Sequence, residues 1–385
     1  MRNLLTLILL LCSMASSAGE LRPLAFSDDL TLEDLRAPYA HLSDDAFRAK
    51  LAASLTSPLL FFRSYVNSYY RDFAQFPHSG RVIACLGDAH PENFGFIEFA
   101  GRTRYVFNDL DDGGDCPLEL DALRYFTAVL LTYQDDELLG ELLREYARAR
   151  QGAAPQPLPE ALQVELAPRR QSLLLKLTRN NLFIPSPEYA SLGPKEHAEL
   201  KQGLAQLPLL KPYRVLDFVQ VVRSSGGSAG LRRYWVLVAR GKWRDVLELK
   251  EEAKPGVSFL TSGAERPERL AELKEKVWQE SPRFYHSVKF QNKTFLLRSR
   301  TKESISLDKT KSKLIPSVLK AQVGLLGEHH RRQHSGWDEA EQKWLEASAR
   351  QLASRYRKLL TTLTKELRVE GQSPRPVNGE KPVDQ

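Results

Sequence analysis

The chain has little cysteine, and it carries no set of cysteine and histidine residues spaced as zinc ligands. Only 3 of its 385 residues are Cys, so a zinc site is not expected. No segment after the N-terminal region approaches the ~20 apolar residues that a membrane-spanning helix needs. A Ser-His-Asp nucleophile signature is also missing, because the glycine-rich stretch near Gly226 lacks the required strand-to-helix context. These absences argue against a zinc protein, a membrane-spanning protein and a serine hydrolase.

The composition is that of an ordinary globular protein with a packed core. Hydrophobic residues make up 42% of the chain and charged residues 27%, and the length allows two lobes or domains. The net charge of +7 suits an anionic partner such as a nucleotide or phosphate, although many basic proteins have no such partner. We do not expect a nucleic acid as the partner.

The N-terminus has the layout of a secretory signal peptide. Residues 1–18 hold one Arg, an apolar run over 4–11 and small residues over 15–18, which predicts cleavage near Gly19 and a periplasmic or secreted protein. Cleavage would leave Cys85 and Cys116 in an oxidising compartment. There the two either form a disulfide or stay as buried thiols.

Two short acidic segments stand beside predicted strands. The first, residues 87–95, holds Asp88, His90 and Asn93; the second, residues 107–112, holds Asp109 and Asp111. Apolar patterns predict strands next to both segments, which places these side chains at strand ends, where ligands often bind. Metal-dependent phosphoryl transfer requires a carboxylate that accepts a proton, together with an Asn and an Asp that hold the metal. We therefore predict a catalytic centre here.

The first acidic segment resembles the catalytic loop of the aminoglycoside phosphotransferase and choline kinase branch of the protein-kinase-like superfamily. The run Asn108-Asp109-Leu110-Asp111 resembles the metal-binding Ile-Asp-Phe segment of that branch. The resemblance implies that Asp88 is the catalytic base and that His90 braces the loop. It also implies that Asn93 and Asp109, with Asp111 beside them, hold Mg²⁺ or Mn²⁺ for ATP or another nucleotide.

The whole chain after residue 18 is similar to the bacterial domain of unknown function 2252 family. The resemblance rests on Ser57-Pro58 with Phe61-Phe62-Arg63, on the first acidic segment, on the run from Pro117 to Arg124, on a glycine-rich turn near Gly226, and on a late helix with His329 and His330. The family name carries no activity. We expect Asp121 to anchor the catalytic loop, and Arg63 and Arg124 to pair with the acidic cluster, which would otherwise repel itself.

The second half of the chain predicts a small antiparallel sheet. Strand patterns cover 215–222, 232–239, 243–251, 284–290 and 294–299. The first turn is small and flexible, and Lys250 ends the third strand. In kinases such a loop covers the ATP phosphates, the Lys contacts them, and a helix Glu holds the Lys. The expected nucleotide-binding residues are Ser225, Gly226, Gly227, Ser228, Gly230 and Lys250, and the glutamate candidates of helix 267–279 are Glu268, Glu272 and Glu275.

The order of these parts predicts an α+β, protein-kinase-like, two-lobe fold that is circularly permuted, because the catalytic segments precede the sheet. The expected division is a signal peptide at 1–18, a helical lobe at 19–205, a nucleotide-lobe-like sheet at 206–300, C-terminal helices that complete the helical lobe at 301–368, and a disordered tail at 369–385. The basic stretch from Arg298 to Lys320 is interpreted as a solvated charge run.

The function that these patterns favour is an exported phosphotransferase with a metal-bound nucleotide and an unidentified acceptor. Exported proteins meet little ATP, so a catalytically silent, kinase-like binding module of the cell envelope is the alternative. A metal-dependent phosphoesterase with Asp109, Asp111 and Asp112 as ligands is a third hypothesis. The oligomeric state and the acceptor do not follow from the sequence.

Overall fold

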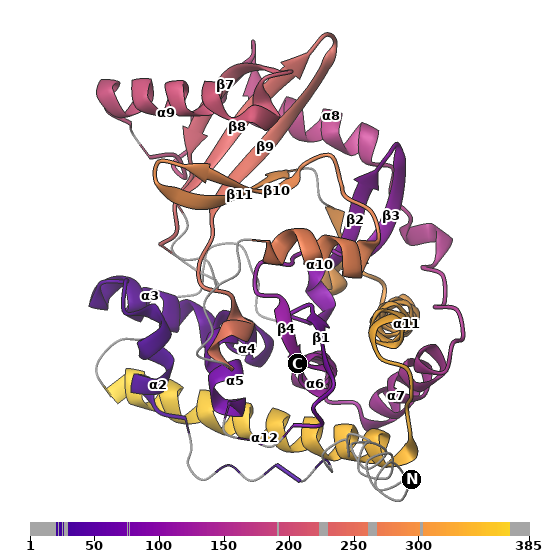
Figure 1. Ribbon diagram of the computed structural model, residues 1–385. Coiled ribbons are helices and arrows are strands. Elements are labelled where there is room, and N and C mark those ends of the chain that lie inside the picture. Colours follow the sequence, from indigo (N-terminus) through magenta and orange to yellow (C-terminus); the bar gives the residue numbers. More distant parts are fainter. Residues whose placement is uncertain are drawn as a thin grey trace, which may run out of the picture.

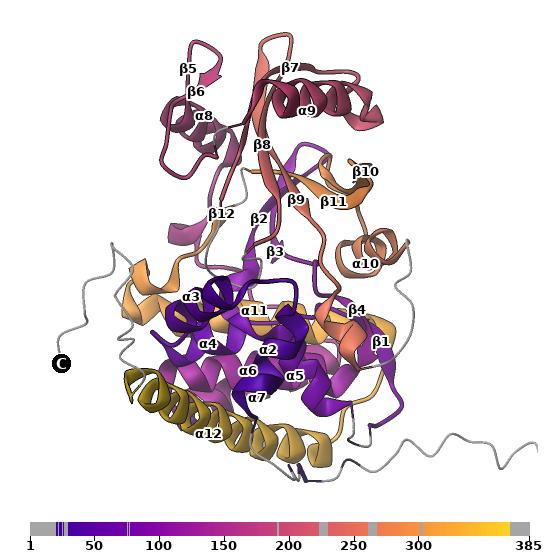
Figure 2. The same ribbon diagram turned by 90° about the vertical axis from the view of Figure 1, so that its left-hand side faces the viewer.

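The computed structural model describes residues 21, 23–24, 26, 30–74, 76, 78–190, 192–222, 230–260, 268–300 and 303–369. The molecule has a helical half and a sheet half, which lie at opposite ends in both views (Figures 1 and 2). Within these residues, no helix combines the length and the apolar character needed to cross a membrane. The mixture of helices with small antiparallel sheets confirms the α+β class.

The helical half is built around α6, which is buried along almost its whole length. Ser57 and Asp135 cap the starts of α4 and α7 with their side chains, and Pro58 takes the first position of α4, as the Ser-Pro pair predicts. The long helix α12 lies across the outer side of this half (Figure 1). The helices of this half are α2 (Leu32–Arg36), α3 (Asp44–Ser54), α4 (Pro58–Ser64), α5 (Val66–Phe73), α6 (Leu118–Tyr133), α7 (Asp136–Arg150), α11 (Ile315–Gln333) and α12 (Glu339–Val369).

Two small sheets carry the acidic segments, one within the helical half and the other a hairpin that extends beside the sheet half (Figures 1 and 2). Strand β1 (Val82–Cys85) pairs with β4 (Gly114–Pro117), and β2 (Phe94–Phe99) forms a hairpin with β3 (Arg102–Phe107). The short β12 (Glu303–Ser304) adds to the free edge of β2. The hairpin is where the alternating pattern predicts it. Strands β4 and β12 are too short to give a period-two signal, and the sequence did not predict them.

The sheet half is a five-stranded antiparallel sheet with the order β10-β11-β9-β8-β7. One face packs on α9 (Pro194–Gln206), and the other carries a smaller core with α8 (Leu166–Leu177) and the hairpin of β5 (Thr178–Arg179) and β6 (Leu182–Phe183). Helix α10 (Arg269–Trp278) lies between the sheet and the helical half (Figure 1). The strands are β7 (Arg214–Gln220), β8 (Arg233–Arg240), β9 (Trp243–Glu251), β10 (Tyr285–Phe290) and β11 (Lys293–Ser299).

Short 3₁₀ helices join these elements, and one of them belongs to the first acidic segment. That one is η2 (Pro91–Asn93), which begins directly after His90. The others are η1 (Ala37–Tyr39), η3 (Glu160–Leu162), η4 (Pro208–Leu210), η5 (Gly256–Phe259), η6 (Leu307–Lys309) and η7 (Ser312–Leu314). Helix α8 begins at Leu166, which places Pro168 in its first turn, where the missing backbone N–H of a proline is tolerated.

Candidate functional site

A cavity of about 650 Å³ lies between the two halves of the molecule. This volume is in the range of small-molecule sites. Its floor comes from the two acidic segments and from helices near the N-terminus, and its roof comes from the end of β9 and the start of β8. The polar and glycine residues that line it include Asp88, Asn93, Asp109, Asp111 and Asp112 on the floor, Arg63 at the side, and Gly230, Arg232, Lys250 and Lys254 on the roof.

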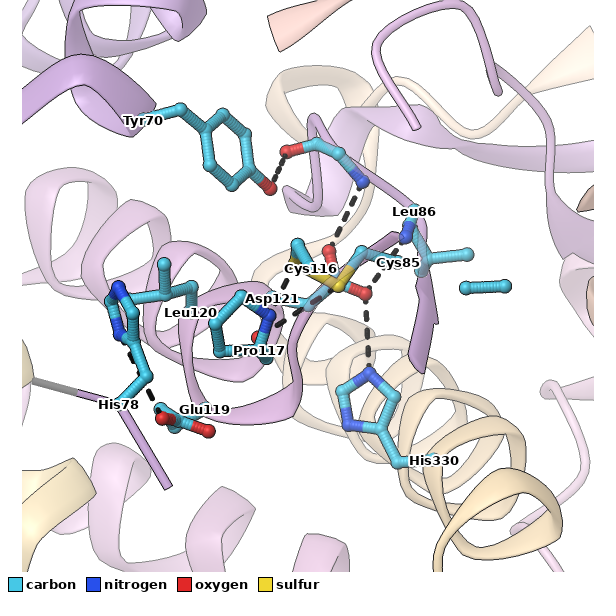
Figure 3. Close-up of a disulfide and its surroundings, with 12 residues drawn as sticks. Tyr70, His78, Cys85, Leu86, Cys116, Pro117, Glu119, Leu120, Asp121 and His330 are labelled. Carbon is cyan, nitrogen blue, oxygen red and sulfur yellow. Dashed lines mark hydrogen bonds and ion pairs between the residues drawn. A yellow bond between two sulfur atoms is a disulfide. The ribbon is translucent and has the colours of Figure 1, made fainter. Parts of the chain in front are cut away.

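A disulfide ties the two acidic segments together at their bases. Cys85 at the end of β1 is bonded to Cys116 in β4, with Cα atoms 5.7 Å apart (Figure 3). Of the two states left open by the sequence, the structure therefore has the disulfide. The bond closes a loop with a sequence separation of 31, and this loop contains every acidic residue on the cavity floor. The covalent link thus limits how far the two segments can separate.

Asp121 anchors the start of the first acidic segment, as the sequence predicts. It lies in the first turn of α6, and its carboxylate accepts hydrogen bonds from the backbone N–H groups of Leu86 (2.9 Å) and Gly87 (3.1 Å). His330 of α11 contacts the same carboxylate through Nε2 at 3.2 Å (Figure 3). On the opposite side, the Tyr70 hydroxyl donates to the Gly87 carbonyl at 2.7 Å. The loop backbone is therefore held directly by α6 and α5, and α11 supports the Asp121 carboxylate.

Gly87 is required by its own conformation and by its neighbour. Its φ of +84° lies in the left-handed region, and a Cβ placed on it would come within 2.2 Å of the backbone of Asp112. The two acidic segments thus approach each other at a point where no side chain fits. The sequence shows a Gly before Asp88, and the structure gives the reason for it.

Asp88, the predicted base, is held by buried partners. Arg124, one turn beyond Asp121 on α6, donates from Nε to Asp88 Oδ1 at 2.9 Å, which confirms the expected pairing. His90 Nε2 lies 3.3 Å from Oδ2, and the Asn93 side-chain amide donates to the Asp88 carbonyl at 3.0 Å. Burial acts to raise the pKa of Asp88, but the charge of Arg124 and the contact with the His90 ring outweigh it and hold the pKa well below its usual range. Asp88 therefore stays ionised.

His90 is placed as a brace. It is fully buried, and burial lowers its pKa to about 4, so the ring is neutral near pH 7. Its Nδ1 accepts a hydrogen bond from the backbone N–H of Glu92 at 3.1 Å, which places the ring proton on Nε2, facing Asp88. Both ring nitrogens thus face groups of the loop itself. Arg63 pairs with Glu92 at the other side of this segment.

Asp109 and Asp111 each meet a basic side chain from the sheet half. Arg298 of β11 donates to Asp109 at 3.0 Å, and Lys250 of β9 forms an ion pair with Asp111. Lys250 and Asp109 thus line the same cavity although about 140 residues of chain separate them. Two sequence expectations are corrected here. Lys250 pairs with Asp111 rather than with Glu268, Glu272 or Glu275 of α10, and Arg298 is not solvated.

The physical reasons for both corrections are visible in the packing. Helix α10 turns its apolar residues toward the helical half, which leaves Glu268 and Glu275 exposed. Arg298 is only 7% exposed, because it stands opposite Glu248 on the neighbouring strand and donates to it at 2.9 Å. Charge runs in sequence are usually solvated, but the first residue of this one belongs to a buried strand.

Glu248 and Asp112 are the residues whose roles the sequence did not identify. Glu248 is buried and pairs with Arg233 and Arg298; burial opposes its ionisation, but the two guanidinium groups hold its pKa well below the usual range. For Asp112, burial and then the charge of Asp88 raise the pKa to about 7. The sequence did hold a signal for Glu248, because residues two apart on a strand share a face and Glu248 therefore lies on the same face as Lys250. From the sequence, Asp112 was predicted only as a metal ligand of a phosphoesterase.

The predicted metal ligands supply oxygen atoms, which suit Mg²⁺ or Mn²⁺. Asp111 has one buried carboxylate oxygen, Oδ1, that accepts no hydrogen bond from the described residues. Asn93 uses its amide nitrogen internally, so its amide oxygen is the atom that a cation could take. Within the described ranges, no group of three or more His, Cys, Asp or Glu side chains is arranged to hold a metal ion. Two aspartates and one asparagine fit a cation that keeps several waters or binds together with phosphate.

The glycine-rich loop lies largely outside the described residues. Ser225, Gly226, Gly227 and Ser228 belong to segment 223–229, which the structure does not describe. Gly230, the last residue of the predicted set, lines the roof of the cavity and has a φ of +77°. The loop therefore ends at the cavity, close to the start of β8.

The fold and the site together define a class of protein. It is a mixed α+β protein in which the acidic floor of a cavity, tied by a disulfide, faces basic side chains of a small sheet. Comparison with protein families identifies the group. The chain belongs to the DUF2252 family, described as an uncharacterized protein conserved in bacteria, with residues 43–151 and 195–368 matched. This confirms the family resemblance seen in the sequence. Neither the curated proteins nor the solved structures give a match. Residues 152–194, outside the matched segments, hold α8, β5 and β6.

Proposed function

We propose that the protein is a kinase-like phosphotransferase that uses a metal-bound nucleotide to phosphorylate a still unidentified acceptor. The observation that carries this proposal is the meeting of Lys250 with Asp111 in a cavity that also holds Asp88, Asn93 and Asp109, with Asp109 paired to Arg298 behind it. Phosphoryl transfer needs cations for the phosphates, oxygen ligands for the metal and a carboxylate for the acceptor hydroxyl. All three kinds of group line the gap between the two halves.

The order of elements supports a circularly permuted kinase-like fold. In protein kinases a glycine-rich turn, a lysine on the third strand and a helix follow one another in the nucleotide lobe. Here the turn between β7 and β8 is followed by β9 with Lys250, and then by α10. The acidic segments, which come after the nucleotide lobe in kinases, precede it here. In such a fold the set of parts is that of a kinase, and only the position of the chain ends differs.

Each cavity residue has a proposed task. A divalent cation, when bound, would neutralise charge on the phosphates, and Asn93, Asp109 and Asp111 would hold it. The Lys250 ammonium would leave its ion pair with Asp111 and pair with a phosphate oxygen of the nucleotide instead. Asp88 would orient the acceptor hydroxyl and take its proton late in the reaction, since its low pKa makes it a weak base in the ground state.

One observation favours the second candidate, a silent binding module. The carboxylate of Asp88 is engaged by Arg124, a fully buried guanidinium, and faces His90. A carboxylate with such partners accepts a proton poorly. In that case the cavity would bind an anionic ligand or partner without turnover.

We also propose that the protein is exported to the periplasm or secreted. Disulfides persist mainly in oxidising compartments, and the bond between Cys85 and Cys116 lies in the core of the site. The layout of residues 1–18 agrees with export. Mass spectrometry of the protein from its host should find an N-terminus near Gly19, and a dominant intact Met1 form would contradict export.

The nucleotide proposal is tested by thermal shift of the chain from residue 19 onward. ATP, GTP and ADP are added with Mg²⁺, with Mn²⁺ or without metal. A ligand at 100 times its Kd stabilises the folded state by about 2.7 kcal/mol, so a metal-dependent rise in Tm is expected. Lys250→Met should reduce the rise, whereas Lys242→Met, an exposed lysine in the turn before β9, should not. No shift with any nucleotide and metal would contradict nucleotide binding.

A further inference from the structure

A second cavity, of about 420 Å³, lies between the β2–β3 hairpin, helix α8 and the first residues of β9 and β10. Its walls are largely apolar and aromatic, with Phe96, Ile97, Leu166, Trp243 and Phe284 among the lining residues. No described residue lines both this cavity and the acidic one. Its volume is in the range of sites for small organic molecules. We call it the aromatic cavity.

The aromatic cavity has one cation at its wall that lacks a carboxylate partner in the described part of the chain. Arg170 pairs with Glu98 and Asp245, and Arg298 pairs with Asp109 and Glu248. Arg283 instead stacks its guanidinium over the rings of Trp243 (5.0 Å) and Tyr213 (5.4 Å). It is exposed, so its N–H groups can reach a ligand while the rings fix its plane.

We propose that the aromatic cavity binds a small monocarboxylate with an apolar, ring-sized body. The apolar walls take the body, and the fork of the Arg283 guanidinium takes the carboxylate in a bidentate pair. Two carboxylates, Glu98 and Asp245, also line the cavity. They disfavour a dianionic ligand such as a phosphate monoester, because they would repel the second negative charge of that ligand. A neutral ring compound would leave Arg283 without its partner.

One side of the aromatic cavity is built by residues outside the segments that match the family. Leu166 and Arg170, which close one side of the cavity, belong to helix α8 in segment 152–194, outside the matched residues. Arg170 reaches both Glu98 on β2 and Asp245 on β9, so the same side chain ties the hairpin to the sheet. The inference does not rest on the proposed phosphotransferase activity.

Calorimetric titration of the chain from residue 19 onward with 2-naphthaleneacetate tests the proposal. We expect binding with a Kd below about 1 mM, and at least tenfold weaker binding of the neutral alcohol analogue and of naphthyl phosphate. Arg283→Gln should weaken binding of the carboxylate by about tenfold or more, since a charge-assisted pair is lost. Arg144→Gln, which changes an exposed arginine of α7 that does not line the cavity, should leave it unchanged.

A cavity-filling variant provides an independent test. Ile97→Trp places a large ring into the aromatic cavity from β2, and it should reduce binding of the carboxylate at least tenfold while the melting curve stays cooperative. The proposal is overturned if the wild-type chain does not bind the carboxylate, if Arg283→Gln binds it as the wild type does, or if the phosphate analogue binds more tightly.

Discussion

The two halves of the molecule hold their polar groups in different ways. In the helical half, the acidic segments are fixed by a disulfide, by backbone hydrogen bonds to Asp121 and Tyr70, and by the buried pair of Asp88 with Arg124. In the sheet half, Lys250 and Arg298 reach the acids only through the ends of long side chains. The difference suggests that the acids are a rigid platform and that Lys250 is the group which rearranges when a ligand enters, since Arg298 is also fixed by Glu248.

The largest expected effect comes from the platform itself. Asp88→Asn should lower phosphoryl transfer by roughly 10²–10⁴-fold, as loss of general-base help does, while metal-nucleotide binding persists. It should also destabilise the fold, because it removes the charge that compensates Arg124, a group with no solvent exposure. Turnover must therefore be measured well below the melting temperature of the variant.

This prediction separates the two candidate functions. Retained nucleotide binding with lost turnover supports an enzyme. Wild-type turnover in Asp88→Asn would remove the base role from Asp88. If the wild-type chain binds nucleotide and no transfer is found with any acceptor, the binding module becomes the better description.

Removing the disulfide should have the next largest effect. Closing a loop of this length, with a separation of 31 residues, reduces the entropy of the unfolded chain enough to stabilise the fold by about 3–4 kcal/mol. The double variant Cys85→Ala/Cys116→Ala should lose about this much in urea unfolding, and the reduced wild-type chain should behave alike. An unchanged free energy of unfolding would show that other contacts alone hold the platform.

The buried histidines make the helical half sensitive to acid. Burial, followed by the charge of His330, lowers the pKa of His329 to about 3 from the ordinary 6.5. The folded state then binds fewer protons than the unfolded state between these values, so stability falls as the pH drops through that window. Going from pH 6.5 to pH 5 should cost about 1.5 kcal/mol from His329 alone.

Comparison with His329→Gln isolates this contribution, because His90 and His330 titrate in the same direction. The variant should show a shallower dependence of unfolding free energy on pH between 6.5 and 5. Equal slopes in both proteins would mean that His329 is not a buried neutral group.

The smallest expected effect is the loss of one hydrogen bond. Tyr70→Phe removes the hydroxyl that donates to the Gly87 carbonyl at 2.7 Å and should cost about 1 kcal/mol. Tyr133→Phe is the matched control, since the Tyr133 hydroxyl is buried without a hydrogen bond to any described residue. A larger loss in the control than in Tyr70→Phe would contradict the role of Tyr70 in holding the loop.

Local patterns were sufficient for much of the fold. Period-two runs located the strands of the sheet to within about two residues, and the Ser57-Pro58 pair located the start of α4. Helix α9 was missed although Pro194 stands at its first position. The strands β5, β6 and β12 have two residues each, which is too few for any periodic signal.

The site was predictable where its residues are close in sequence and was not predictable where they are distant. Asp88, Asn93 and Asp109 follow from two short motifs, and they do line one cavity. The partner of Lys250 depends on how the two halves meet, so Asp111 could not be chosen over a helix glutamate from sequence. Arg298 was misjudged for the same reason, because its burial comes from a neighbouring strand.

The most direct test of the central claim is calorimetric titration of Mg²⁺-ATP into the wild-type chain, Asp109→Asn and Asp115→Asn. Asp115 is an exposed carboxylate inside the same disulfide-closed loop, so its variant controls for a general loss of negative charge. The account predicts binding that requires Mg²⁺ in the wild type and in Asp115→Asn, and no binding in Asp109→Asn. Equal binding by Asp109→Asn, or binding that is independent of metal, would contradict a metal-nucleotide site on this platform.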